Sequence, residues 1–429
     1  IDGSYRYDQS TALPKSKRGY DYFSGGLSWV FTDYVKNTPI NFAKVRASYA
    51  EVGSDPESVD AATGYYYNNG SLYGTPYFGV SDGTVSTQVA FDFSNLKPER
   101  TKSWEAGLEM QFFKNRVGFD IAVYKTNTEN QFNYVQRSTG TYYYREFMNV
   151  GEVENKGIEV ALNLTPVKSN DFKWDINLNW AKNENKLKSL QPGVNNLVLG
   201  TYQGGITIGA TVGQSLGVII GTDYVYDNNG NRVVGADGLY LQNENQVIGK
   251  TQPKWTGGIT NRFTYKNFSL SFLIDVKHGG SVYSLDQAYG QETGIYRNTA
   301  GLNDLGNPVR NPLDQGGGII FDGVKEDGTK NDIRVDASES GLAFAHDARP
   351  NKAYVYNAGY IKLREVALSY TMPEEIFAGT FVRSLTFGLV GSNLWIIQKN
   401  LPNADPESGL GSGNLQGFQS GVMPTTRTF

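Results

Sequence analysis

The stretch FKWDINLNW, residues 172–180, places a large apolar side chain at every second position. The apolar positions are Phe172, Trp174, Ile176, Leu178 and Trp180, and the polar positions between them are Lys173, Asp175, Asn177 and Asn179. A β-strand directs successive side chains to opposite faces, so this stretch predicts a strand with one apolar and one polar face. In a soluble sandwich the apolar face packs into a core, whereas in a membrane barrel it contacts lipid and the polar face lines a lumen.

The same two-residue period recurs along the chain and predicts further strands. It is visible at residues 23–31, 43–49, 104–112, 117–123, 158–164, 255–265 and 268–276. Two more predicted strands, at residues 360–370 and 384–395, change phase near Arg364 and near Val390. An extra residue in a strand shifts the phase of its side chains, so we expect a β-bulge at each of these places.

The predicted strands are joined by short and long connections that alternate strictly. Short connections follow Phe31, Phe113, Leu164 and Tyr265, whereas the long ones span residues 55–98, 130–148, 186–251, 281–355 and 397–422. Outer-membrane barrels have short periplasmic turns and long extracellular loops, and a soluble sandwich rarely carries several such long loops at one end. The pattern therefore favours an all-β transmembrane antiparallel barrel, in which residues 373–382 form a short helical or irregular periplasmic connection.

A barrel assigns the two faces of these strands to lipid and to lumen. The predicted lipid-facing residues are Phe172, Trp174, Ile176, Leu178, Trp180, Phe268, Leu270, Phe272 and Ile274. The predicted lumen-facing residues are Glu105, Glu109, Asp120, Glu159, Lys173, Asp175, Asn177, Asn179 and Asp275. The alternation alone fits equally well the solvated face of a half-buried soluble sheet, and it is the unequal connections that favour the barrel.

The composition excludes several kinds of site. The chain has 429 residues, a net charge of −4 and no cysteine, so it offers no basic stripe for nucleic acid, no disulfide framework and no thiolate metal site. Its 50 glycines, 28 tyrosines and 22 phenylalanines fit many strands, turns and interfacial rings. No run reaches the ~18–20 apolar residues of a transmembrane helix, but barrel strands carry only a weak, alternating signal.

The sequence gives little support for catalysis or for a bound metal. Its two histidines are His278, after a predicted strand, and His346, in a long connection, and neither context predicts the buried, oriented imidazole of a Ser-His-Asp site. Asp227–Gly238 resembles a calcium loop, but Gly230 occupies the place of a ligand, which favours a tight turn. Gly409–Asn414 is glycine-rich but lacks the strand and helix that flank a phosphate-binding loop. We therefore expect no catalytic residue, no cofactor and no metal.

Two tyrosine-rich stretches, residues 64–79 and 141–147, fall in predicted extracellular loops. Exposed tyrosines can stack on sugar rings or pack against a partner protein, because they combine apolar area with a polar tip. They can equally pack against neighbouring loops of the same barrel. The candidate ligand or partner contacts are Tyr65, Tyr66, Tyr67, Tyr73, Tyr77, Tyr142, Tyr143 and Tyr144.

Six segments spread along the chain resemble the C-terminal half of the β-barrel of SusC/RagA-type TonB-dependent outer-membrane transporters of Bacteroidota. They are Leu96–Gln131, Asn149–Asn163, Pro253–Gly280, Tyr360–Pro373, Ser392–Ser408 and Met423–Phe429. The resemblance implies a barrel of about 22 strands, of which about 11–12 lie in residues 1–429. It also implies that the N-terminal plug, the TonB box and the first barrel strands are not in this chain.

The resemblance further implies a function and partners. A member of this family imports a large nutrient, an oligosaccharide or a peptide, across the outer membrane of a Gram-negative bacterium, driven by TonB. A SusD-like surface lipoprotein covers the extracellular side, and the pairs of barrel and lipoprotein are expected to form a dimer. Two alternatives stay open: a barrel of the same family that is a structural component of a larger outer-membrane assembly, and a non-membrane all-β glycan-binding module.

Overall fold

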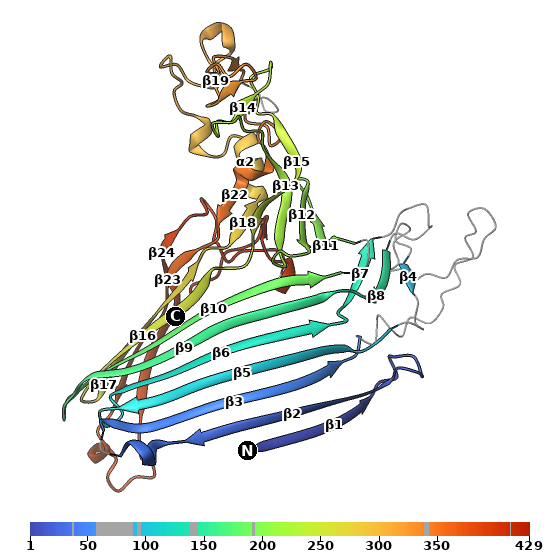
Figure 1. Ribbon diagram of the computed structural model, residues 1–429. Helices are drawn as coiled ribbons and strands as arrows, with labels where there is room; N and C mark the ends of the chain where they lie inside the picture. Colours follow the sequence, from blue (N-terminus) through green and yellow to red (C-terminus); the bar gives the residue numbers. More distant parts are fainter. Residues whose placement is uncertain are drawn as a thin grey trace.

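The computed structural model describes residues 1–36, 38–56, 89–91, 96–136, 145–190, 194–338, 343–411 and 413–429. Its main feature is one curved antiparallel sheet of eleven strands, drawn in the lower part of Figure 1. In sheet order these strands are β1 (Asp2–Gln9), β2 (Gly19–Val30), β3 (Ile40–Ser54), β5 (Glu99–Phe112), β6 (Val117–Glu129), β9 (Glu152–Lys168), β10 (Phe172–Ser189), β16 (Trp255–Tyr265), β17 (Phe268–His278), β23 (Tyr360–Thr371) and β24 (Thr386–Lys399). The sheet order equals the chain order, so each strand turns back beside the one before it.

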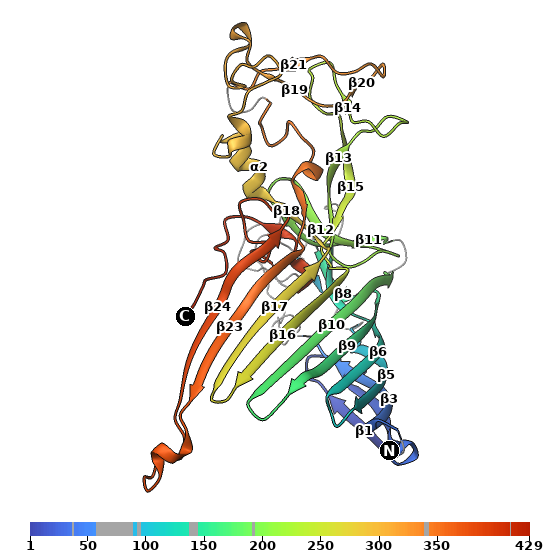
Figure 2. The same cartoon turned by 90° about the vertical axis from the view of Figure 1, so that its left-hand side faces the viewer.

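The main sheet is open at its two edges. β1 and β24 form these edges, and within the described ranges they are not hydrogen-bonded to each other. Figure 2 shows the strands curving together as part of a cylinder. The expected all-β antiparallel barrel is therefore confirmed as a partial barrel, and its eleven strands agree with the expected number of about 11–12.

Strand β10 shows why the sheet has two different faces. Leu178 lies opposite Leu162 of β9 and Ile259 of β16, so an apolar row crosses all three strands. The next residue towards the N-terminus, Asn177, lies opposite Asn163 and belongs to the other face. Because the register is kept over many residues, the alternation seen in single stretches of sequence becomes an apolar face and a polar face of the whole sheet.

A bulge between β9 and β10 lies near Pro166. Trp174 lies opposite Val167 and Ile176 lies opposite Leu164, so two steps along β10 match three steps along β9. Proline has no N–H to donate to the ladder, which restricts it to edges and bulges.

Of the two bulges predicted in the last strands, one lies at its predicted place and the other does not. β23 changes register against both of its neighbours around Arg364, as the phase change predicts. The second bulge lies further along β24 than predicted: Val390 stays in register with β23, and the register shifts between Ser392 and Trp395. Asn393 has a left-handed backbone, with φ 54°, and takes up the extra length there.

The connections leave the sheet at two ends, which we call the short-turn end and the long-loop end. The short-turn end holds residues 31–39 with η1 (Thr32–Val35), 113–116, 169–171, 266–267, and 372–385 with η7 (Glu374–Phe377). At the long-loop end, connections join Gln9 to Gly19, Ser54 to Glu99, Glu129 to Glu152, Ser189 to Trp255 and His278 to Tyr360, and Lys399 also lies there. The predicted alternation and the helical connection near residues 373–382 are confirmed, but β10 extends to Ser189, past the expected loop start at residue 186.

The long connections fold into small units of their own. The largest is a four-stranded sheet of β11 (Asn196–Tyr202), β12 (Ile206–Thr211), β13 (Val218–Tyr224) and β15 (Gln242–Lys250). The other elements are β4 (Val89–Phe91), β7 (Phe132–Gln136), β8 (Arg145–Asn149), β14 (Val233–Val234), β18 (Ser281–Ser284), α2 (Leu285–Glu292), η4 (Arg297–Thr299), η5 (Leu313–Gln315), β19 (Ile319–Ile320), β20 (Val324–Lys325), β21 (Arg334–Val335), η6 (Asn351–Tyr354), β22 (Val355–Asn357), η8 (Gly413–Leu415) and β25 (Phe418–Gln419).

The two largest buried clusters lie in these connections and not against the main sheet. One of them joins Ile206, Ile219, Tyr283, Tyr354 and Phe418, which come from five separate elements of the chain after β10. Figure 1 shows these elements standing above the long-loop end of the sheet. The apolar face of the main sheet is thus left without a covering element in the described part of the chain. No helix among the described residues is long and apolar enough to span a membrane.

Candidate functional site

The polar face of the main sheet carries charge pairs between neighbouring strands. Arg46 of β3 binds Asp120 of β6 at 2.8 Å and Glu105 of β5 at 3.3 Å. To reach β6, the Arg46 side chain crosses Gly107 of β5. A Cβ at Gly107 would lie 2.4 Å from the guanidinium carbon, so a larger residue would displace the arginine.

The pairing register places all nine predicted lumen-facing residues on this one face. They are Glu105, Glu109, Asp120, Glu159, Lys173, Asp175, Asn177, Asn179 and Asp275. Asp120, Asn179 and Asp275 share one cross-strand row, through Ala161 and Gly258. A cavity of about 420 Å³ is lined by Arg46 together with Asp120, Glu159, Asn179 and Asp275. That this face lines a lumen stays a prediction.

Five charged residues near the long-loop end of this face form what we call the mouth ion network: Asp275, Lys362, Arg364, Asp405 and Glu407. Lys362 Nζ lies 2.6 Å from Asp405 Oδ1 and also binds Glu407. Arg364 reaches both carboxylate oxygens of Glu407, at 2.8 and 2.9 Å, and also binds Asp275. The network therefore fastens the chain that follows β24 to strands β17 and β23.

Burial and the two-residue period of β23 shape this network. The side chains of Lys362 and Asp405 are only 3 % and 2 % exposed, and charges so deeply buried are stable only when they are paired. Arg364 lies two residues after Lys362 and therefore shares its face, and the extra residue at the bulge lets β23 continue with Val366 on the apolar face. Asp405 is also held by hydrogen bonds from the Thr425 hydroxyl, at 2.8 Å, and from the N–H of Glu407, at 3.0 Å.

Four members of the mouth ion network were not predicted from the sequence, namely Lys362, Arg364, Asp405 and Glu407. Lys362 and Asp405 are 43 residues apart, and no spacing rule links them. The available signal was the phase change at Arg364 together with two acidic residues in the connection after β24.

The mouth ion network is expected to resist mild acid. Burial alone would raise the pKa of Glu407, but hydrogen bonds from Arg364, Lys362 and Tyr360 outweigh it and lower the pKa to about 2. Because this folded-state pKa lies below the ordinary value of 4.5, the stabilisation is complete above about pH 4.5 and is lost as the pH falls towards 2. Amide-exchange protection of residues 400–411, corrected for intrinsic rates, should therefore persist at pH 4 and decline below it. Protection lost already between pH 6 and 5 would contradict this, and Glu407→Gln should lower protection at all these pH values.

The apolar face of the main sheet is widely exposed. The predicted lipid-facing residues share it, namely Phe172, Trp174, Ile176, Leu178, Trp180, Phe268, Leu270, Phe272 and Ile274. On the same face Trp104, Leu389 and Trp395 are 61 %, 76 % and 58 % exposed. Asn261 is a polar exception, and its Oδ1 accepts a hydrogen bond from Trp174 Nε1 at 3.1 Å. Contact of this face with lipid stays a prediction.

The tyrosine candidates and the histidines contribute no catalytic arrangement to the described structure. The eight tyrosines, Tyr65, Tyr66, Tyr67, Tyr73, Tyr77, Tyr142, Tyr143 and Tyr144, lie outside the described residues. His278 ends β17 and stacks on Trp255, with ring centroids 5.2 Å apart, and His346 Nδ1 lies 2.9 Å from a carboxylate oxygen of Glu292.

The two loop motifs form ordinary turns. The carboxylate of Asp227 accepts hydrogen bonds from the backbone N–H groups of Asn229 and Asn231, so its own turn occupies it. In Gly409–Asn414, the last residues begin the single turn η8, which no strand precedes directly. Over the residues that the structure describes, no group of three or more His, Cys, Asp or Glu side chains could hold a metal ion.

Comparison with models of protein families identifies the family of the chain. The family model described as TonB dependent receptor-like, beta-barrel matches residues 1–306, which is more than half of the chain. The chain belongs to this family. It is part of an outer-membrane β-barrel, as expected, in a family of transporters and receptors.

Relatives within the TonB-dependent receptors support the assignment. TonB-dependent receptor P3 of Formosa agariphila is 25 % identical over 99 % of this chain and 42 % of its own length. TonB-dependent receptor SusC of Bacteroides thetaiotaomicron is 26 % identical over 74 % of this chain and 34 % of its own length. The RagAB peptide importer in its closed-closed state superposes with a TM-score of 0.71 and 18 % identity, over 99 % of this chain and 44 % of that chain. The resemblance to SusC/RagA-type receptors is confirmed, and the chain spans less than half the length of these relatives.

Proposed function

We propose that residues 1–429 form the C-terminal part of the barrel of a TonB-dependent importer, which carries a large nutrient across the outer membrane. In this proposal the plug, the TonB box and the first barrel strands belong to the rest of the receptor. The transported molecule is an oligosaccharide or a peptide, and it crosses the membrane without any bond being made or broken.

One observation carries the proposal: the main sheet is two-faced and open. Its polar face gathers Arg46, Asp120, Glu159 and Asp275 around a cavity, and charged groups of this kind suit a water-filled lumen. Its apolar face packs on no described element, so a soluble sandwich, which needs a second sheet there, does not fit. The family comparison supports the same reading.

The long-loop end is the side on which we place the partner lipoprotein. The folded units there are large and have their own buried clusters, so they offer stable surfaces for a second protein. A solved relative is described as the RagAB peptide importer, and another relative is named SusC. From these names we propose a SusD-like surface lipoprotein as the partner and TonB as the source of energy, with two such pairs forming a dimer.

The proposal is tested by purifying the full-length native protein from membranes in a mild detergent and identifying by mass spectrometry what travels with it. We expect a SusD-like lipoprotein in equal amount, and uptake of the substrate bound to that pair should stop when TonB is removed. Recovery with other assembly proteins and without such a lipoprotein would favour a structural component. Recovery in the soluble fraction without detergent would contradict the barrel.

A further inference from the structure

The apolar face of the sheet ends abruptly in charged residues on the side of the long-loop end. Following each strand outward along this face, the first charged residue is Glu51 on β3, Lys102 on β5, Lys125 on β6, Lys156 on β9 and Lys182 on β10. Four of these five residues are lysines. On four neighbouring strands, therefore, the apolar belt is bordered by positive charge.

The border between apolar and charged residues shifts along the strands from one strand to the next. Tyr49, Trp104, Lys125 and Lys156 form one cross-strand row, which is aromatic on β3 and β5 but already charged on β6 and β9. On β10 the row below is already charged, since Lys182 lies opposite the apolar Ile158 of β9. The border thus steps by two residues from β5 to β6 and again from β9 to β10, and it does not step from β3 to β5 or from β6 to β9. Over these four intervals between neighbouring strands the average shift is one residue per strand.

A shift of one residue per strand is the value that a membrane surface would impose. One residue is about 3.3 Å of strand and neighbouring strands are about 4.8 Å apart, which corresponds to a strand tilt of about 35°. Strands in outer-membrane barrels are tilted by about 35–45°. The lysines therefore lie at one height, just outside the apolar belt.

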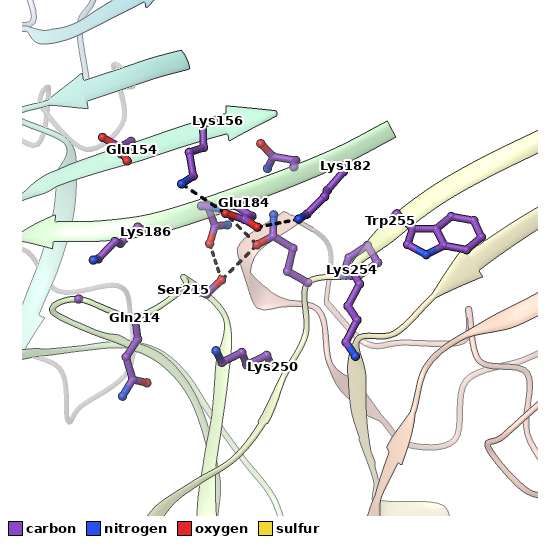
Figure 3. Close-up of a pocket in the computed structure, with 15 residues that line it drawn as sticks. Glu154, Lys156, Lys182, Glu184, Lys186, Gln214, Ser215, Lys250, Lys254 and Trp255 are labelled. Carbon is purple, nitrogen blue, oxygen red and sulfur yellow. Dashed lines mark hydrogen bonds and ion pairs between the residues drawn. The ribbon is translucent and has the colours of Figure 1, made fainter. Parts of the chain in front are cut away.

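A cavity opens at this height where β10 and β16 separate. Its volume is about 560 Å³, and its charged lining residues are Lys156, Lys182, Lys186, Lys250, Lys254, Glu154 and Glu184. Five lysines against two glutamates leave a clear excess of positive charge. Figure 3 shows Lys156 and Lys182 on either side of Glu184, with Lys250 and Lys254 across the cavity from them.

Part of this positive charge is not neutralised by the protein. Lys156 and Lys182 each pair with Glu184, at 3.5 and 3.0 Å. Lys186, Lys250 and Lys254 are exposed, and none of the three has an ion pair with a carboxylate in the described ranges. The cavity is therefore ready to accept an anion.

A second hollow on the same face suits an acyl chain. It has a volume of about 550 Å³, and its lining includes Leu27, Ala47, Trp104, Ala106 and Val123, with Lys125 beside them. The small side chains of Ala47 and Ala106 lie opposite each other, between larger apolar neighbours. Lys125 is paired with Glu154 at 2.9 Å, so this hollow offers an apolar groove for an acyl chain and no free positive charge.

We propose that the cavity between β10 and β16 binds the phosphate groups of lipid A, the phosphorylated glycolipid of the outer leaflet, as an annular lipid of the barrel. The proposal rests on the proposed function, because it needs the apolar face in the membrane and the long-loop end outside. Lys186, Lys250 and Lys254 contact the phosphates, and the apolar belt below them contacts the acyl chains.

The test compares two charge-matched triple variants of the full-length protein. Lys186→Gln, Lys250→Gln and Lys254→Gln remove the cavity lysines, whereas Lys114→Gln, Lys168→Gln and Lys330→Gln remove exposed lysines elsewhere. Native mass spectrometry measures the retention of bisphosphorylated lipid A and of chemically dephosphorylated lipid A, with inorganic phosphate as a competitor. A lysine near an anionic surface contributes about a factor of five, so the cavity variant should bind lipid A on the order of 100-fold more weakly. The control variant should bind like the wild type.

Three results would overturn the lipid site: a cavity variant that binds like the wild type, equal binding of dephosphorylated lipid A, or displacement by millimolar inorganic phosphate, which would indicate a free-anion site. Each binding measurement is made on protein that keeps a folded, heat-modifiable barrel and copurifies with its lipoprotein. A failure of lipid binding in such protein leaves the proposed import function standing. A wild-type protein that does not enter the outer membrane would overturn both.

Discussion

Replacing Ile176 by arginine is expected to lower the free energy of barrel unfolding by about 2–4 kcal/mol, the cost of an arginine on the lipid face at the bilayer midplane. Ile176 is the central residue of the apolar run on β10, with Trp174 and Leu178 on either side along the same face. The measurement is urea-induced unfolding of the protein in lipid vesicles, together with the amount that assembles in the outer membrane. We expect both to fall.

The neighbouring residue provides a matched control. Asn177 belongs to the polar face, opposite Asn163 and Thr260, so an arginine there meets water and polar groups. Asn177→Arg should therefore assemble and unfold as the wild type does, within about 0.5 kcal/mol. If Asn177→Arg is the damaging substitution and Ile176→Arg is tolerated, the assignment of the two faces is wrong.

Replacing Lys362 by methionine is expected to release the chain after β24 from the barrel wall. The substitution leaves Asp405 buried with its main cationic partner gone, and breaking one side of a buried ion pair costs about 3–5 kcal/mol. Thr425 and the N–H of Glu407 still donate to Asp405, so the loss concerns the local anchoring of residues 400–425. Amide exchange and limited proteolysis of this segment should both become faster.

Two further variants show whether the effect of Lys362→Met comes from the broken buried ion pair or would follow the loss of any paired lysine. Lys325→Met breaks an exposed pair with Asp332, whose side chain is 76 % exposed, and should cost at most about 1 kcal/mol. Combining Lys362→Met with Asp405→Asn removes both buried charges and should restore part of the protection. Unchanged exchange in Lys362→Met would show that the mouth ion network does not hold this segment.

The main sheet could be predicted from the sequence because its signals are local. The strand at residues 172–180 and the two-residue turn at Lys266 and Asn267 depend on side-chain period and turn residues within a few positions. The phase change at Arg364 was a correct local signal for a bulge. The bulge predicted near Val390 lies a few residues further along β24, at Asn393. Asn393 absorbs the register shift through its left-handed backbone, which the apolar pattern does not reveal.

The candidate sites could not be predicted in the same way, because they join residues that are far apart in the sequence. Lys362 meets Asp405 only after the chain has run along β23 to the short-turn end and returned along β24. Asn351 accepts a hydrogen bond from the N–H of Thr222, 129 residues away. The lysines of the cavity between β10 and β16 come from β9, β10, the end of β15 and the residue before β16. Only the register of the sheet relates the lysines of β9 and β10 to each other in height.

The most direct test of the central claim is the accessibility of single cysteines placed one at a time along residues 172–180 of the membrane-embedded protein. The chain contains no cysteine, so each substitution adds one thiol to this region. We predict that cysteines at positions 173, 175, 177 and 179 react with a water-soluble maleimide, whereas those at 172, 174, 176, 178 and 180 react only with a lipid-soluble one. Loss of this alternation, or its reversal, would contradict a barrel whose apolar face contacts lipid.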